Sequence, residues 1–494
     1  MSDALSPDAV HLGLDLGTQS VRAVAVDGTG TLLAAASRPL TSHRDGVRHE
    51  QDPERWWSAA GDACREALSG IDNRRVRDMA VDATSGTVLL ADPSGTPLTP
   101  ALMYDDGRAA DHADRVNTVG AAVWEKLGYR TMQSSWALPK LLWLLQHTDV
   151  PPGARLLHQA DLITWRLTGR RTASDASHAL KTGYDLLADR WPAEELAALG
   201  IPDGLLPEVV HPGTVIGAVC ARAAAITGIP VGTPVAGMTD GCAAQIGAGA
   251  LGPGAWNSVL GTTLVLKGAA LHPVRDPAGV VYCHRGPGGS WLPGGASSSG
   301  AGVLTRRFPG ADLDALTERA AATGSTAVVY PLVGERGERF PFRAPDARPF
   351  VLGEPTGAAE EFHACLLGVA CVERLCLDHL DHIGAPVGGP LSLTGGGARN
   401  RYWSQLRADL LGRSVTLPAQ GGSAVGMAVL AATASGVTLE QAAASMVRTG
   451  IELRPDSSRT ERLLPGYLGF VDELVHRGWL EPRVAAHAHR KADR

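Results

Sequence analysis

The sequence predicts an α/β protein of two related domains, and three observations point to it. Strand-like runs rich in Val, Leu and Ala alternate with segments of helical periodicity, which is the pattern of layered α/β folds. A strand followed by a Gly–Thr turn occurs in each half, at Gly17–Thr18 and at Gly261–Thr262. The 494 residues also exceed what one domain of roughly 150 residues holds.

Charge and composition exclude several classes of protein. The 45 Lys and Arg residues and the 51 Asp and Glu residues give a net charge of −6, and the basic residues are scattered. No basic stripe for a nucleic acid can therefore be drawn. The sequence has no apolar run of 18 residues and no signal-peptide pattern at its start, so we expect a cytoplasmic protein that binds no membrane. Its seven cysteines form no C-x-x-C pair, which argues against a zinc site or a disulfide framework.

The first half reads as a β-meander followed by a helix and further strands. Asp52 is a helix cap with Pro53 at the first helical position, and Gly70 is the stop. The expected elements are strands at 10–17, 21–26 and 31–35, a helix from Pro53 to Leu68, and strands at 76–81 and 87–90. The Gly- and Pro-rich stretch 228–234 then separates two domains, which we place at residues 1–235 and 236–480.

The second half repeats the pattern of strands, glycine turns and helices. An apolar stripe predicts a helix over 358–383, with Gly384 as its stop, and a strand at 391–393 leads into Gly395-Gly396-Gly397. Residues 481–494 are basic and irregular, and we expect a flexible tail there. Two related domains that face each other across a nucleotide would explain the repeated strand–turn pattern.

The Gly–Thr turns are typical of phosphate binding. A glycine after a strand lets the backbone approach a phosphate, and the threonine adds a hydroxyl and an amide. The residues concerned are Gly17, Thr18, Gly261, Thr262 and Thr263. No G-x-x-x-x-G-K-[ST] sequence occurs, so a P-loop is excluded. The literal G-x-G-x-x-G match at 247–252 is followed by Pro253 instead of a helix, and we interpret it as structural.

Two aspartates stand where a phosphoryl-transfer enzyme needs carboxylates. Asp15 precedes the first turn, and Asp240 ends the run 236–239 in the second half. Transfer to an alcohol needs a general base beside the hydroxyl and a metal held by carboxylate. One aspartate in each half can fill these roles, and the spacing does not decide which is the base and which holds magnesium.

These segments resemble the FGGY family of carbohydrate kinases from about residue 11 to about residue 440. Gly13-Leu-Asp-Leu-Gly-Thr18 is similar to the family's first phosphate motif, and Gly237-Met-Thr-Asp240 to its catalytic-base segment. Leu260-Gly-Thr-Thr263 resembles the second phosphate loop, and Thr394-Gly-Gly-Gly-Ala-Arg-Asn400 resembles the adenosine motif. The resemblance implies two ribonuclease H-like (actin-like ATPase) domains with a cleft between them, and ATP with Mg²⁺ as cofactors.

Within the family, the segments Asp82-Ala-Thr-Ser-Gly86 and Ala179-Leu-Lys-Thr-Gly-Tyr184 look like the D-ribulokinase branch. This resemblance implies that Asp15, Ser85 and Asp240 hold the ketopentose, with Asp240 as the catalytic base and Asp15 also at the metal. The adenine contacts that it implies are Gly396, Gly397, Asn400 and Trp403. Arg108 lies near the family's sugar-contacting W-x-D-x-R region without being identical to it, and its role stays open.

The resemblance therefore implies an ATP-dependent sugar kinase that phosphorylates the terminal hydroxyl of D-ribulose. D-Xylulose, L-ribulose or a sugar alcohol is the nearest alternative substrate. An actin-like nucleotide switch without sugar kinase activity is the alternative from a different class. The sequence is compatible with a homodimer, because its apolar stripes can face either the core or a second copy.

Overall fold

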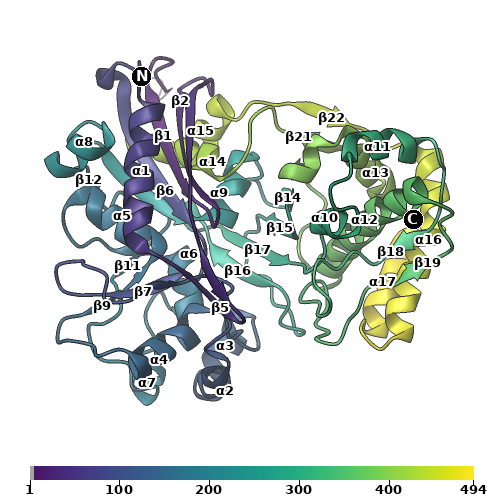
Figure 1. Ribbon diagram of the computed structural model, residues 1–494, viewed down its shortest axis with the longest axis horizontal. Coiled ribbons are helices and arrows are strands. Elements are labelled where there is room, and N and C mark those ends of the chain that lie inside the picture. Colours follow the sequence, from purple (N-terminus) through teal and green to yellow (C-terminus); the bar gives the residue numbers. More distant parts are fainter. Residues whose placement is uncertain (1–4, 494) are drawn as a thin grey trace. The chain divides into compact units, whose positions relative to one another are not determined.

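The computed structural model describes residues 5–493, and the chain divides into two compact α/β units (Figure 1). Unit 1 comprises the chain up to Gly249 together with His284–Leu292 and Gln420–Arg448. Unit 2 comprises Ala250–Cys283, Pro293–Ala419 and the chain from Thr449 onward. The α/β class agrees with the prediction. The boundary differs from the one placed at 235, because unit 1 extends to Gly249 and regains two later segments.

Unit 1 is built on one large sheet. Its elements are β1 (Val10–Leu16), β2 (Ser20–Asp27), β3 (Leu32–Pro39), β4 (His43–Asp45), β5 (Arg48–Gln51), α1 (Pro53–Ala67), β6 (Val76–Ala83), β7 (Val88–Ala91), β8 (Ala101–Leu102), α2 (Ala110–Val119), α3 (Ala121–Leu127), α4 (Ala137–His147), β9 (Arg155–His158), α5 (Gln159–Thr168), β10 (Ser174–Asp175), α6 (Ala176–Ala179), α7 (Ala193–Ala198), β11 (Val209–Val210), β12 (Gly217–Ala218), α8 (Ala221–Thr227), β13 (Pro234–Thr239), α9 (Asp240–Gly247), α14 (Ser423–Ala431) and α15 (Leu439–Met446). The large sheet has the order β12-β13-β6-β1-β2-β3. Strands β13, β6 and β1 are parallel, and β2 and β3 continue from β1 as the antiparallel meander that the sequence predicts.

Helices cover both faces of this sheet. On one face α1, α5 and α8 pack together over buried side chains that include Leu12, Leu14 and Val81. On the other face lie α9 and α14, and a Cβ atom at Gly13 would stand 1.8 Å from the carbonyl oxygen of Ala424. Helix α14, which comes from the C-terminal half of the chain, thus packs on the sheet formed by the N-terminal strands (Figure 1). The glycine that opens the first motif is therefore required by helix packing.

The crossing of α9 and α14 explains the G-x-G-x-x-G match. A Cβ atom at Gly247 would stand 2.4 Å from the carbonyl oxygen of Gly422, and one at Gly426 would stand 1.9 Å from that of Ala243. Two backbones can approach this closely only where side chains are missing. The structural interpretation of residues 247–252 is confirmed.

Unit 2 repeats the topology of unit 1. Its elements are β14 (Trp256–Leu260), β15 (Leu264–Gly268), β16 (Tyr282–Arg285), β17 (Trp291–Ala296), α10 (Gly302–Arg307), α11 (Leu313–Ala321), β18 (Val328–Val329), β19 (Val351–Leu352), α12 (Ala358–His382), β20 (Leu391–Thr394), α13 (Arg401–Leu411), β21 (Val415–Leu417), β22 (Ile451–Leu453), α16 (Ser457–His476) and α17 (Pro482–Ala492). Strand β14 is antiparallel to β15 and parallel to β20, which is parallel to β21. The trio β1, β2 and β6 of unit 1 has the same pattern. Two related domains were predicted, and both Gly–Thr turns close the equivalent antiparallel hairpin.

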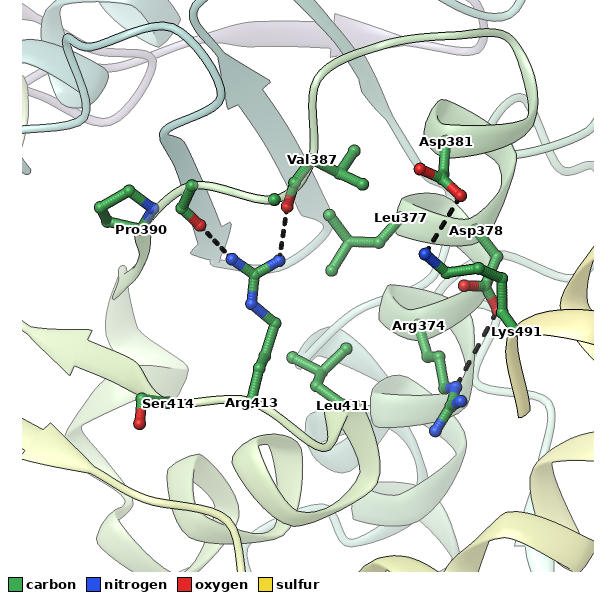
Figure 2. Close-up of a pocket in the computed structure, with 12 residues that line it drawn as sticks. Arg374, Leu377, Asp378, Asp381, Val387, Pro390, Leu411, Arg413, Ser414 and Lys491 are labelled. Carbon is green, nitrogen blue, oxygen red and sulfur yellow. Dashed lines mark hydrogen bonds and ion pairs between the residues drawn. The ribbon is translucent and has the colours of Figure 1, made fainter. Parts of the chain in front are cut away.

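The C-terminal segment is ordered, so the prediction of a flexible tail was wrong. Residues 482–492 form α17, whose Val484, Ala485 and Ala488 are buried. The helix packs on α12 and α16, and Lys491 Nζ lies 3.2 Å from Asp381 Oδ2 (Figure 2). Apolar residues at helical spacing among the basic ones account for this packing. No helix in the described part of the chain is long and apolar enough to cross a membrane.

Candidate active site

Three carboxylates lie at the carboxyl ends of the parallel strands in unit 1. Asp15 on β1 and Asp82 on β6 are register partners, and Thr239 at the end of β13 is the partner of Ala83. Asp240 comes next, at the first position of α9. The carboxyl ends of parallel strands form the ligand-binding edge of open α/β sheets. This edge is the candidate active site.

Asp15 and Asp240 belong to the same unit, so the expectation of one aspartate in each domain was wrong. The cause is the pairing of β13 with β6, which joins residues 234–239 to the first sheet. The domain boundary predicted at residue 235 falls inside β13 and separates most of it from β6, the strand it pairs with. Both carboxylates can therefore act on one small ligand.

The aspartates influence each other's protonation. Asp82 is fully buried, and neither of its carboxyl oxygens accepts a hydrogen bond from an N–H or hydroxyl group of the described residues. Burial raises the pKa of Asp82 well above its ordinary value, and the charges of Asp15 and Asp240 add to the rise. Burial likewise raises the pKa of Asp15 to about 6. Both shifts favour the protonated form, and the pKa of Asp82 is the one raised further.

Sequence reasoning missed Asp82 as a site residue, although the segment that contains it was singled out. The available signal was the parallel alignment of the runs 10–17 and 76–81, which places an aspartate beside Asp15. That alignment depends on a pairing between Asp15 and Asp82, 67 residues apart, whose register cannot be read from the sequence alone.

Asp240 is fixed at the start of α9. Its Oδ1 accepts the backbone N–H of Gly241 at 2.7 Å, and the hydroxyl of Ser423 donates to its carbonyl oxygen at 3.2 Å. The N–H groups at a helix N-terminus favour a negative charge there. Just before it, the N–H of Thr239 donates to Ser177 Oγ at 2.9 Å, which ties β13 to α6.

Ser85 lies in a loop whose backbone is held by two lysines. Lys181 Nζ donates to the carbonyl oxygen of Ser85 at 3.0 Å, and the buried Lys140 Nζ donates to that of Gly86 at 2.6 Å. Gly86 has φ of +95°, a conformation that favours glycine. The Ser85 hydroxyl itself is buried and has no partner among the described residues. It is available to a ligand.

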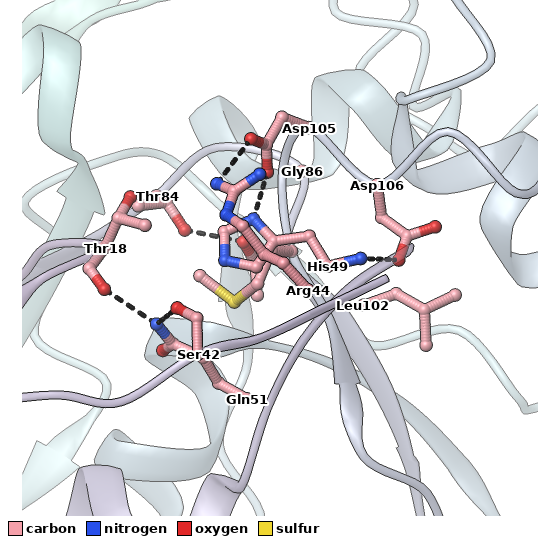
Figure 3. Close-up of polar contacts among 12 residues, drawn as sticks. Thr18, Ser42, Arg44, His49, Gln51, Thr84, Gly86, Leu102, Asp105 and Asp106 are labelled. Atoms are coloured by element: carbon pink, nitrogen blue, oxygen red, sulfur yellow. Dashed lines mark hydrogen bonds and ion pairs between the residues drawn. The ribbon is translucent and has the colours of Figure 1, made fainter. Parts of the chain in front are cut away.

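The first Gly–Thr turn is braced from β5. The N–H of Gly17 donates to the carbonyl oxygen of Ser20 at 3.0 Å, which closes the turn. Figure 3 shows Gln51 donating to the carbonyl oxygen of Thr18, at 2.7 Å, and to the hydroxyl of Ser42. Thr18 is half-buried, and its turn has a fixed backbone, as a phosphate-binding turn requires.

Arg108, whose role the sequence left open, is part of an ion-pair network. Its side chain is only 6% exposed, donates to both carboxylate oxygens of Asp106, and lies 2.6 Å from Glu50 Oε1. Its guanidinium also stacks on Trp143 at 4.8 Å. Asp106 in turn accepts the backbone N–H of His49 (Figure 3). These bonds hold the loop after β8 and leave Arg108 little capacity for a sugar.

In unit 2, the second turn and the triple glycine stand at the ends of neighbouring parallel strands. The N–H of Gly261 donates to the carbonyl oxygen of Thr263 at 3.1 Å, and Thr262 is exposed. Gly396 is exposed, with open space where a Cβ atom would stand, whereas one at Gly397 would lie 2.5 Å from Leu260 Cδ2. Gly396 can therefore face a ligand, and Gly397 is needed for packing.

Two of the residues expected at the adenine are otherwise engaged. Asn400 caps α13 through its Oδ1, which accepts the N–H of Trp403 at 2.9 Å, and its Nδ2 donates to Thr317 Oγ1 at 2.8 Å. Trp403 is 2% exposed, and its indole N–H donates to the carbonyl oxygen of Leu366 at 3.0 Å. This burial does not support a direct adenine contact by Trp403, which instead packs in the core of unit 2.

The acidic edge fits a magnesium ion that is held mainly by its substrate. No group of three or more His, Cys, Asp or Glu side chains in the described part of the chain has the geometry of a protein-built metal site. Magnesium is usually bound through one or two carboxylates, with phosphate oxygens and water completing its shell. The Asp15 carboxylate is the group at this edge that would supply an oxygen ligand to such an ion.

Unit 2 also contains a cavity of about 600 Å³ away from these motifs (Figure 2). Arg374, Arg413 and Lys491 line it, but each already has partners. Arg413 Nη1 donates to the carbonyl oxygen of Val387 at 2.7 Å, and Lys491 pairs with Asp381. We assign no ligand to this cavity.

The chain matches two family models. Residues 10–247 match the N-terminal domain of the FGGY family of carbohydrate kinases, and residues 256–435 match its C-terminal domain. A xylulose kinase of Streptomyces coelicolor is 31% identical over 475 residues, which cover 94% of this chain and 95% of that protein. A glycerol kinase of Ectopseudomonas mendocina is 30% identical and covers 94% of this chain and 99% of its own.

Solved structures of sugar kinases have the same fold as this chain. A xyloylose kinase from Brucella ovis superposes with a TM-score of 0.84 at 26% identity, over 93% of this chain and 98% of that one. A xylulose kinase from Rhodospirillum rubrum gives a TM-score of 0.82 at 28% identity, over 94% and 98% of the two chains. The fold is that of the ribonuclease H-like, actin-like kinases, and the chain belongs to the FGGY family of carbohydrate kinases, sugar phosphotransferases that use ATP.

Proposed function

We propose that this kinase transfers the γ-phosphate of ATP to the terminal hydroxyl of a ketopentose, with D-ribulose as its preferred substrate. The observation that carries the proposal is the edge of unit 1, where Asp15 and Asp82 are register partners and Asp240 follows the neighbouring strand β13. The partnerless hydroxyl of Ser85 follows β6 at the same edge. Carboxylates and hydroxyls recognise a neutral polyol, whereas a sugar phosphate would need cations. D-Xylulose is the alternative, because several of the relatives are xylulose kinases.

Asp240 is the general base of the proposed reaction. Its carboxylate accepts the proton of the terminal hydroxyl as that oxygen attacks the γ-phosphorus, and ADP leaves. The hydrogen bond from the N–H of Gly241 to Oδ1 holds this carboxylate at the start of α9. Ser85 and Asp15 orient the remaining hydroxyls. The chain forms no covalent intermediate in this scheme.

The nucleotide is held by backbone amides. Within unit 1 we assign Gly17 and Thr18 to phosphate binding. Within unit 2 we assign Gly261, Thr262 and Thr263 to phosphate binding and Gly396 to the adenosine. We assign Gly397 and Asn400 to the backbone around the adenosine site. Gly397 packs against Leu260, and Asn400 donates a hydrogen bond to Thr317. Asp15 would hold a magnesium ion, which would supply positive charge next to the phosphate oxygens. We expect ADP release to require added Mg²⁺, and full activity in EDTA would contradict this assignment.

We also propose that the protein works in the cytoplasm. Its seven cysteines are unpaired, as expected in a reducing compartment. A homodimer stays a prediction.

The test is a substrate panel. ADP release is measured with ATP, Mg²⁺ and each of D-ribulose, D-xylulose, L-ribulose, ribitol and glycerol, with a reaction without sugar as the control. We expect the highest kcat/KM for D-ribulose. A higher value for D-xylulose would replace the substrate but keep the mechanism. ADP release that no sugar increases would reject the proposed function.

A further inference from the structure

Buried polar atoms without protein partners occur in the segments next to the candidate active site. Among the described residues, the side chains concerned come from the ends of β6 and β13 and from the starts of α5 and α6. The atoms are Ser85 Oγ, Gln159 Nε2, His178 Nε2 and Thr239 Oγ1. Buried polar groups in folded proteins are nearly always hydrogen-bonded, so a group of orphaned atoms indicates a ligand.

Two hydrogen bonds place these atoms together. Thr84, which follows β6, donates through its hydroxyl to Gln159 Oε1 at 2.6 Å, so the amide of Gln159 lies beside the loop of Ser85. The N–H of Thr239 donates to Ser177 Oγ at 2.9 Å, which brings α6 and His178 to the end of β13. The carboxylate of Asp240 is close enough to act on the charge of His178.

His178 is held in one orientation. Its ring is fully buried, and Nδ1 lies 2.6 Å from Asp175 Oδ2. The other oxygen of Asp175 accepts the backbone N–H groups of Ser177 and His178. An ionised carboxylate beside Nδ1 takes its N–H, so Nε2 is the nitrogen left for another partner.

The inference rests on the proposed function and names one more residue of its sugar site. We propose that His178, oriented by Asp175, contacts the sugar directly, with Nε2 hydrogen-bonded to a hydroxyl of the ketopentose. A hydroxyl satisfies Nε2 whether it carries a proton or not, because O–H both donates and accepts. The orphaned atoms include donors and acceptors but no Lys or Arg side chain, which fits a neutral polyol.

The protein contains a matched control for this assignment. His11 is also fully buried, its Nδ1 lies 2.7 Å from Asp78 Oδ1, and its Nε2 has no partner among the described residues. It stands near the start of β1, beside the start of β6, at the opposite end of the sheet from the carboxylates. A purely structural role of such a pair would give the two histidines the same behaviour.

The test compares His178→Asn with His11→Asn. Asparagine places an amide near the position of Nδ1 and removes Nε2. For His178→Asn we expect the KM for D-ribulose to rise tenfold or more, which is about 1.4 kcal/mol, with kcat and the KM for ATP within threefold of wild type. For His11→Asn we expect all three constants to stay within twofold of wild type. We expect the melting temperatures of His11→Asn and His178→Asn to fall by similar amounts.

Three results would overturn the proposal. A sugar KM of His178→Asn within twofold of wild type would exclude the contact. An equal KM effect in His11→Asn would show a structural cause. A fall in kcat at unchanged KM would make His178 a positioning residue for Asp240. Because wild type serves as the reference, sugar-dependent turnover in wild type separates failure of this inference from failure of the proposed function.

A second variant and a binding measurement guard against misfolding of His178→Asn. His178→Gln places its amide near Nε2, and we expect its sugar KM within threefold of wild type. In ¹⁵N-histidine-labelled wild-type protein, D-ribulose without ATP should shift one Nε2 resonance, and the shift should persist in His11→Asn. The absence of any shifted Nε2 resonance at saturating sugar would contradict the contact.

Discussion

Replacing Asp240 by asparagine tests the assignment of the base. The Asn side-chain oxygen can accept the same N–H of Gly241, at 2.7 Å in the native protein, so the start of α9 should be kept. The variant loses only the proton acceptor. General-base catalysis contributes about 10²–10⁴ in rate, so the barrier should rise by about 2.7–5.4 kcal/mol.

The assay is ADP release under saturating ATP and sugar, together with equilibrium binding of each. We expect kcat to fall by at least a hundredfold while ATP binding stays within threefold. Asp111→Asn is the control, because Asp111 is an exposed aspartate in the first turn of α2 in the same unit, and its kcat should not change. A kcat for Asp240→Asn within tenfold of wild type, about 1.4 kcal/mol, would refute the role of base.

Three further predictions concern stability. Arg407→Leu breaks the fully buried pair with Glu373, whose N–O distances are 2.6 and 2.7 Å, and should lower the free energy of unfolding by about 3–5 kcal/mol in denaturant titrations. Gly426→Ala puts a Cβ atom 1.9 Å from the carbonyl oxygen of Ala243 and should cost at least about 1–3 kcal/mol. For His178, the stability deficit of His178→Asn against wild type should be largest below about pH 6.5 and shrink as the pH rises.

The controls for these variants come from the same chain. Replacing Arg407 and Glu373 together by leucine should recover most of the loss, and a double variant no more stable than Arg407→Leu would contradict the pairing argument. Gly469→Ala, in α16 with open space at its Cβ position, should be neutral or stabilising. A Gly426→Ala protein as stable as Gly469→Ala would show that the crossing of α9 and α14 can relax.

The pH prediction follows from the direction of one shift. Burial alone would lower the pKa of His178, but Asp175 outweighs it and raises the pKa, with Asp161 and Asp240 adding to the rise. The ring of His158 also packs against His178, with 5.8 Å between the two ring centroids. A group with a raised pKa in the folded state adds stability below its unfolded value, and this stability is lost as the pH passes the folded value. A deficit that grows above pH 6.5 would contradict this sign.

Local pattern predicted much of the fold. The meander of β1–β3, the helix begun by Asp52 and Pro53, and the long helix α12 all depend on periodicity and caps within a single segment. The Gly–Thr turns likewise follow strands that the pattern identified. These features are encoded by neighbours in sequence, so a single sequence suffices to find them.

What the sequence could not give depends on pairings across long stretches of chain. The return of α14 to the first sheet requires the backbone contact of Gly13 with Ala424, more than 400 residues apart. The places of Asp82 and His178 in the site follow from the register of β1, β6 and β13 and from one hydrogen bond to Ser177. The burial of Trp403 beneath its motif is a packing result that motif similarity does not reveal.

The most direct measurement is a crystal structure with D-ribulose and a non-hydrolysable ATP analogue. The account predicts the sugar at the edge of β1, β6 and β13, with its terminal hydroxyl about 2.6–3.2 Å from a carboxylate oxygen of Asp240. A sugar bound away from this edge, or one whose terminal hydroxyl points away from Asp240, would contradict it.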